Sequence, residues 1–201
     1  MDGATGKGRP LAATAANTEQ RDLLARSQRG DAEAYGMIVK QHQTRIHGYI
    51  LRMVRDATLA EDLTQEAFIR AYRKLHLYDL ERPFLPWLFR LAANLTQNHL
   101  RSASRRELPQ APERLTLVHC AETPSDERAE RRQLLRQVDR ALDQLAPKYR
   151  AAMVLKHVEG LSYSEISQVL GVSVWALKMR VSRARAKLRA LIDIESGEAQ
   201  R

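Results

Sequence analysis

The chain has 201 residues, a formal net charge of +9 and an apolar content of 44%, so it can build one domain or two small ones. Its excess of Lys and Arg favours an acidic polymer as the partner. The single cysteine, Cys120, excludes an internal disulfide framework and fits a reducing cytosol. No apolar run approaches the ~20 residues of a membrane span, so we expect no membrane insertion.

Hydrophobic periodicity predicts an all-α protein with two small helical domains joined by a flexible linker. Apolar residues recur at helical spacing almost throughout, and no segment has the pattern of a strand ladder. The predicted helices are 18–29, 32–55, 57–75, 84–105, 124–145 and 147–158, followed by a pair within 162–192. Pro109 and Pro112 prevent a helix in the linker. The expected organisation is a disordered tail over 1–17, domains over 18–106 and 124–194, the linker over 107–123, and a tail over 195–201.

The second and third predicted helices carry apolar stripes for a core and leave an acidic and amide patch outside. The stripes are Tyr35, Ile38, Val39, Ile46, Ile50 and Met53, then Ala60, Leu63, Ala67, Ala71 and Leu75. The patch is Glu61, Asp62, Gln65 and Glu66. On an otherwise basic protein it is either ordinary surface, with acids favoured near a helix N-terminus, or a docking face for a basic protein partner. The residues alone leave both interpretations open.

The helix predicted over 84–105 carries aromatic, amide and guanidinium groups on its outer face. They are Trp87, Arg90, Asn94, Gln97 or Asn98, and Arg101. Such groups suit unpaired bases, which stack on π faces and expose polar edges. The preceding loop, 76–83, contains His76, Tyr78 and Arg82 and could cover a base drawn out of the stack. Trp87 suits the core equally well, because the apolar stripe of this helix runs close beside it.

The helical pair within 162–192 has the pattern of a helix-turn-helix. Ser162 and Glu165 form a capping box, Gly171 supplies a residue for positive φ, and Ser173 caps a second helix. Its inward positions are Val174, Leu177, Val181, Leu188 and Leu191. Its outer face is Trp175, Lys178, Met179, Ser182, Arg183, Arg185, Lys187 and Arg189. A charged face is usually just solvated, but six Lys or Arg without an acid over 172–192, behind a capped turn, indicate DNA binding.

Two long segments resemble a known family, the bacterial extracytoplasmic-function (group 4) RNA polymerase sigma factors. The first segment is DATLAEDLTQEAFIRAYRKL over 56–75 followed by RPFLPWLFRLAANLTQNHLRS over 82–102, and it resembles the promoter-melting domain, region 2. The second is LAPKYRAAMVLKHVEGLSYSEISQVLGVSVWALKMRVSRARAKLR over 145–189, and it is similar to region 4. The resemblance covers residues 18–192 in the expected order.

The resemblance implies a dissociable subunit that binds core RNA polymerase, directs it to promoters and opens the duplex, without chemistry or a cofactor of its own. It implies a role in a stress or envelope response. It also implies four partners, namely the polymerase β′ clamp helices, the β flap, promoter DNA, and an anti-sigma factor that holds both domains until a signal arrives. Such a partner would keep this cytoplasmic protein at the inner face of the membrane.

The family's site residues are carried over by motif. The polymerase-binding set, around the DLxQExF pattern, is Glu61, Asp62, Gln65, Glu66 and Phe68. The minus-10 set is His76, Tyr78, Arg82, Trp87, Arg90, Asn94, Asn98 and Arg101, with His99 in the same segment. The minus-35 set is Trp175, Lys178, Met179, Ser182, Arg183, Arg185 and Lys187. Trp175, Ala176 and Met179 stand where many members have small residues, so the minus-35 sequence preference cannot be copied from relatives.

Two other function classes compete with this interpretation. A helix-turn-helix regulator that binds an operator without polymerase would leave the segments around 62–68 and 84–100 unexplained. An enzyme or metal protein is disfavoured because the histidines are scattered and Cys120 has no evident base. These histidines are His42, His47, His76, His99, His119 and His157.

Overall fold

The computed structural model describes residues 11–105 and 138–198, with side chains described for 17–103 and 138–190. Every regular element within these ranges is helical. The first group comprises α1 (Leu11–Gln28), α2 (Ala32–Val54), α3 (Ala57–Lys74), the short 3₁₀ turn η1 (Leu75–Leu77) and α4 (Phe84–Arg105). The second comprises a helical stretch at 138–143, α6 (Pro147–Met153), the π-helical turn η2 (Val154–Val158), α7 (Tyr163–Leu170) and α8 (Val174–Glu198).

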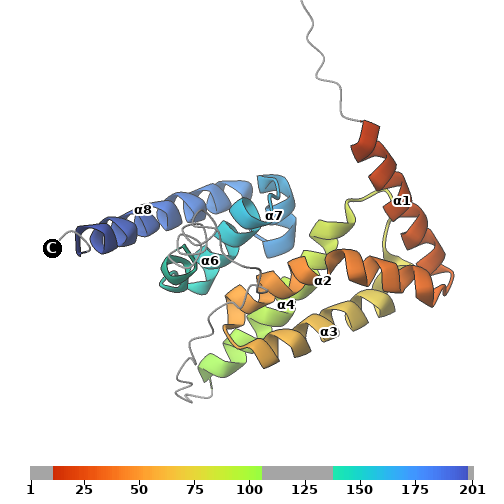
Figure 1. The fold of residues 1–201 in the computed structure, drawn as a ribbon, viewed down its shortest axis with the longest axis horizontal. Helices are drawn as coiled ribbons and strands as arrows, with labels where there is room; N and C mark the ends of the chain where they lie inside the picture. Colours follow the sequence, from red (N-terminus) through yellow and green to blue (C-terminus); the bar gives the residue numbers. More distant parts are fainter. Residues whose placement is uncertain (1–10, 106–137, 199–201) are drawn as a thin grey trace, which may run out of the picture.

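The helices of the first group form a bundle, with α2, α3 and α4 side by side and α1 packed on one end of α2 (Figure 1). Its core is Ile38, Ile46, Tyr49 and Ile50 of α2, Ala60, Ala67 and Ala71 of α3, and Leu88, Phe89 and Ala92 of α4. The small side chains of α3 let it approach both neighbours closely, and the larger ones fill the space between them. The bundle therefore fixes which face of α3 and which face of α4 remain outside.

Local caps set the helix limits in the first group. The Asp31 carboxylate accepts a hydrogen bond from the Ala34 backbone amide at 2.9 Å and begins α2, and Asp56 does the same for Leu59 and α3. Between α2 and α3 the backbone of Arg55 adopts φ 64°, the left-handed conformation that glycine usually supplies. The surrounding structure must hold Arg55 there, and its ion pair with Asp143 helps to do so.

The predicted all-α fold is confirmed, with differences at four places. Helix α1 begins at Leu11 and α8 continues to Glu198, so parts of both predicted tails are helical. The helix predicted over 147–158 changes to π-helical geometry at η2, where the Glu159 amide donates to the Val154 carbonyl at 3.0 Å. Val174, predicted to face inward, is 38% exposed because the first turn of α8 projects beyond the core. The linker 107–123, Cys120, His119 and the Leu191 side chain lie outside the described residues.

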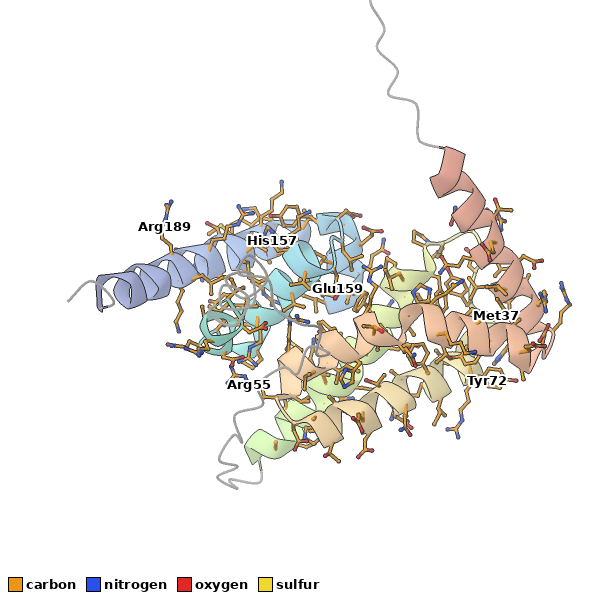
Figure 2. All side chains as sticks on the ribbon, in the orientation of Figure 1. Met37, Arg55, Tyr72, His157, Glu159 and Arg189 are labelled. Atoms are coloured by element: carbon orange, nitrogen blue, oxygen red, sulfur yellow. The ribbon has the colours of Figure 1, made fainter. Side chains whose placement is uncertain are left out.

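The two groups contact each other through α4 with α7 and through α2 with α6. Three ion pairs join α2 to the second group, and each has its arginine on the α2 side. Arg45 donates to the Glu159 carboxylate at 2.9 Å and Arg52 to Asp139 at 3.3 Å, while Arg55 pairs with Asp143. Figure 2 shows Arg55 and Glu159 along this junction. Because the Glu159 side chain is only 5% exposed, its pair is the best shielded of the three.

Candidate polymerase and promoter DNA interfaces

The outer face of α3 is the side opposite the buried alanine stripe, and the helix begins at the cap residue Asp56. Glu61, Asp62 and Gln65 are exposed on it, whereas Glu66 is half-buried and pairs with Arg70 at 2.5 Å. Ile69 and Tyr72 continue the same face, and they are 45% and 44% exposed. We call Glu61, Asp62, Gln65, Ile69 and Tyr72 the α3 outer face. The acids lie toward the start of α3, and two exposed apolar side chains, Ile69 and Tyr72, follow toward its end. The sequence pattern did not indicate this apolar end.

Phe68, predicted to contact the polymerase, lies in the core. Its side chain is 6% exposed, and its backbone carbonyl accepts a hydrogen bond from the Tyr35 hydroxyl at 2.6 Å. The Tyr35 ring packs on Tyr72 with 4.8 Å between ring centroids. Phe68 therefore supports the α3 outer face from below, and its side chain is buried in the structure of the chain alone.

The outer face of α4 brings together four of the eight predicted minus-10 residues. Arg90, Asn94, Asn98 and Arg101 are exposed at successive turns, and we call these four residues the α4 polar stripe. Leu88, Ala92 and Leu95 on the opposite side are buried. His99 is half-buried. The stripe has guanidinium groups at its ends and amide groups between them, which suits phosphates at the ends and base edges in the middle.

The loop before α4 is held by hydrogen bonds from one side chain of α1, and other residues of the loop are exposed to solvent. The Gln28 side-chain amide donates to the backbone carbonyls of Leu75 and Tyr78 at 2.9 and 2.8 Å, tying the loop to α1. His76 and Arg82 are exposed, and Arg82 contacts Asp79 at 3.3 Å. The loop thus has a fixed base and a polar, accessible rim.

Tyr78, predicted as a stacking surface for a base, is instead part of the core. It is 6% exposed, its hydroxyl donates to the Arg82 carbonyl, and burial raises its pKa to about 12. Its ring meets Trp87 and Phe84 at centroid distances of 4.9 and 5.5 Å. Trp87 is half-buried and rests on both rings. Of the two aromatic residues, Trp87 alone has the exposure that a stacking contact needs.

In the second group, short-range hydrogen bonds build the predicted helix-turn-helix. The capping box is present, since the Ser162 amide donates to Glu165 at 2.8 Å and the Glu165 amide donates to the Ser162 hydroxyl at 3.2 Å. Gly171 ends α7 with φ 64°. The Ser173 hydroxyl then accepts from the Ala176 amide at 3.2 Å and begins α8. Leu177, Val181 and Ala184 bury the inner side of α8, which fixes its outer side.

All seven predicted minus-35 residues are exposed on α8. The list is Trp175, Lys178, Met179, Ser182, Arg183, Arg185 and Lys187. Two of the cations already have partners in their own domain, because Arg185 contacts His157 at 3.1 Å and Lys187 donates to the Gln144 carbonyl at 2.9 Å. Arg189 is exposed and points away from the helices (Figure 2).

A hollow of about 230 Å³ lies beside the first turns of α8. Its lining is Lys148 and Tyr149 of α6 with Trp175, Ala176, Met179, Arg180 and Arg183 of α8. A hydrogen bond from the Arg183 guanidinium lowers the pKa of the Tyr149 phenol from its ordinary value. Tyr149 and Arg183 line the same hollow, and this contribution of α6 could not be predicted from the spacing within α8.

Family comparisons agree with the geometry of both groups. The family model "Sigma-70 region 2" matches residues 38–106, and "Sigma-70, region 4" matches residues 135–188. The RNA polymerase sigma-H factor of Pseudomonas aeruginosa is 36% identical over 84% of this chain and 92% of its own length. The ECF RNA polymerase sigma factor SigW of Bacillus subtilis is 34% identical over 80% of this chain and 90% of its own length. This chain belongs to the extracytoplasmic-function sigma factors.

Among solved structures, the sigma factor is similar to CnrH in complex with the cytosolic domain of CnrY. The identity is 31%, the TM-score is 0.66, and the match covers 88% of this chain and 98% of CnrH. The match spans both regions together. The sigma factor therefore directs RNA polymerase to promoters through regions 2 and 4, and it belongs to a family of initiation factors that are not enzymes.

A membrane-spanning helix and a cluster of metal ligands are both absent from the part of the chain that the structure describes. No helix within 11–105 or 138–198 is long and apolar enough to cross a membrane. Across the same part of the chain, no three His, Cys, Asp or Glu side chains gather in a group that could hold a metal ion.

Proposed function

We propose that the sigma factor divides promoter initiation among three surfaces. The α3 outer face docks on the β′ clamp helices of core polymerase, the α4 polar stripe takes unpaired minus-10 bases, and the first turns of α8 read the minus-35 element. Region 4 also meets the β flap. A role in a stress or envelope response stays a prediction from the family resemblance.

The observation that carries this proposal is the division of α4 into two faces. Asn94 and Asn98 are exposed beside two arginines, although α4 is otherwise packed against α2, α3 and α7. Amide side chains form hydrogen bonds with base edges, and unpaired bases expose those edges. Trp87, half-buried at the start of α4, offers one aromatic surface close to the stripe.

A regulatory partner is part of the proposal. The solved structure of CnrH is a complex with the cytosolic domain of CnrY, and the sigma factor matches CnrH across both regions. We expect an anti-sigma factor to bind this sigma factor as well, and to contact both region 2 and region 4. Such a partner would hold the sigma factor in the cytoplasm or at the inner membrane face until a signal releases it.

Permanganate footprinting of thymines in the transcription bubble tests the role of the α4 polar stripe. The Asn94→Ala protein, assembled with core polymerase, should open a duplex promoter poorly and should recover on a promoter whose minus-10 segment is pre-opened by mismatches. Gln41→Ala is the matched control, since it removes an exposed amide from another helix, α2. Wild-type reactivity with Asn94→Ala on duplex template would show that the stripe takes no part in opening.

A further inference from the structure

The first turns of α8 present an apolar pair at the place where the DNA reader would face base edges. Trp175 is 74% exposed and Met179 is 39% exposed. Residues four apart in a helix lie on one face, so the two side chains form a continuous apolar surface. Solvation of this surface costs free energy in the unbound protein, since nothing covers it in the described structure.

The surroundings of the pair are cationic. Lys148, Arg180 and Arg183 line the same hollow, and the hollow has no acidic residue in its lining. Lys148 lies over the Tyr149 ring at 5.1 Å, and Tyr149 lines the hollow together with Arg183. An apolar floor with a cationic rim complements duplex DNA, whose phosphates border grooves that contain the base edges. An apolar surface for a protein partner does not require such a rim.

The chemistry of the base edges indicates which group of the DNA an apolar pair such as Trp175 and Met179 can contact. In the major groove the base edges present hydrogen-bond donors and acceptors, and one apolar group, the C5 methyl of thymine. The early residues of a recognition helix are those that contact base edges. Met179 has no donor and Trp175 has only its indole N–H, so most of the surface that the pair presents is apolar and can bury methyl groups.

We propose that Trp175 and Met179 recognise thymine methyl groups in the minus-35 element. This inference rests on the proposed function, in which α8 reads that element. Arg183 lies four residues beyond Met179 and continues the same stripe with a cation. The arginine sets the register of α8 along the groove, and the apolar pair selects thymines at adjacent positions.

A selection experiment that separates the methyl group from the rest of the base tests the inference. Holoenzyme assembled from the full chain and core polymerase selects duplex promoters with a randomised minus-35 segment, synthesised with either thymine or uracil. Uracil keeps the O4 acceptor and the pairing of thymine but lacks the methyl group. Burial of one methyl contributes roughly four-fold in affinity, so thymine libraries should show about that preference per contacted position and uracil libraries none.

The variants Trp175→Ala and Met179→Ala should each lose the thymine preference at their own position and still assemble with core polymerase. Val158→Ala is the matched control, because Val158 is an apolar residue of the same domain that is 47% exposed on η2. It should select the same sequences as the wild type. Circular dichroism of the variants checks that α8 remains folded.

Three results would overturn the inference, and they differ in what they leave standing. If the wild type enriches one minus-35 sequence equally in both libraries, the methyl groups are not read, although the proposed function holds. If neither library shows any enrichment in this segment, the role of α8 in minus-35 recognition fails as well. If the alanine variants keep the thymine preference, the apolar pair does not read the methyl groups, and other residues of α8 do.

Discussion

Replacement of Arg150 should destabilise region 4 and loosen its contact with region 2, because this buried side chain joins two helix ends. Arg150 is 6% exposed, and its guanidinium donates to five backbone carbonyls. Three are at the end of the helical stretch at 138–143 and in the turn after it, and they are those of Leu142, Asp143 and Leu145, at 2.9 to 3.1 Å. The other two, from Arg52 and Met53, are at the end of α2. Both helix ends carry partial negative charge that a cation stabilises.

The size of the effect follows from these five bonds. Arg150→Met keeps an apolar stem and removes every donor. A net loss of about 1 kcal/mol for each carbonyl gives roughly 5 kcal/mol before any compensation. The variant also avoids desolvation of the guanidinium, the same burial that lowers the pKa of Arg150, and this offsets part of the loss. We therefore expect the free energy of unfolding of region 4 to fall by about 2 to 4 kcal/mol.

Urea denaturation of the full chain, followed by circular dichroism and by amide hydrogen exchange in α6 and α7, measures this loss. Arg150→Lys should fall between wild type and Arg150→Met, since one ammonium cannot reach five acceptors. Arg140→Met is the control, because Arg140 is an exposed arginine in the same helical stretch. If Arg150→Met unfolds within ~0.5 kcal/mol of Arg140→Met, the five bonds contribute nothing measurable and the reasoning is wrong.

Two further predictions concern region 2. Asp62→Arg should weaken copurification with core polymerase. It should leave the free energy of unfolding within ~0.5 kcal/mol of wild type, because the side chain is exposed. Glu19→Arg on α1 is the control, and equal recovery of core polymerase with both variants would refute the docking role of the α3 outer face. Burial, together with the charge of Arg45, lowers the pKa of His42 from 6.5 to about 4, so the unfolded chain takes up the proton first as pH falls. The contribution of neutral His42 to stability should be complete above pH 6.5 and decline toward pH 4, by roughly 3 kcal/mol. His42→Gln should lessen this decline in urea titrations at several pH values, and an identical decline in both proteins would contradict it.

The helix limits and the helix-turn-helix could be predicted from the sequence because their determinants are local. Asp31, Asp56 and Ser162 each bond an amide three residues ahead, and Gly171 supplies its own backbone conformation. The exposed α4 polar stripe follows in the same way from helical periodicity. These features required no knowledge of which helices pack together.

Other features depend on tertiary contacts and could not be predicted. Tyr78 has the sequence environment of a loop residue, yet Phe84 and Trp87 of the next helix cover its ring. Phe68 belongs to a binding motif, but α3 turns it inward. The acceptors of Arg150 on α2 lie 97 and 98 residues away in sequence, so no local pattern could indicate them.

The distribution of cations explains why net charge identifies a partner class but not a contact surface. Arg45, Arg52 and Arg55 are used in ion pairs between the two regions, and Arg185 and Lys187 contact their own domain. These residues contribute to the charge of +9 without being free for phosphates in this arrangement. The salt dependence of DNA binding reports the phosphates that are actually neutralised. It is therefore set by the cations that the fold leaves available, and a count from the sequence overestimates it.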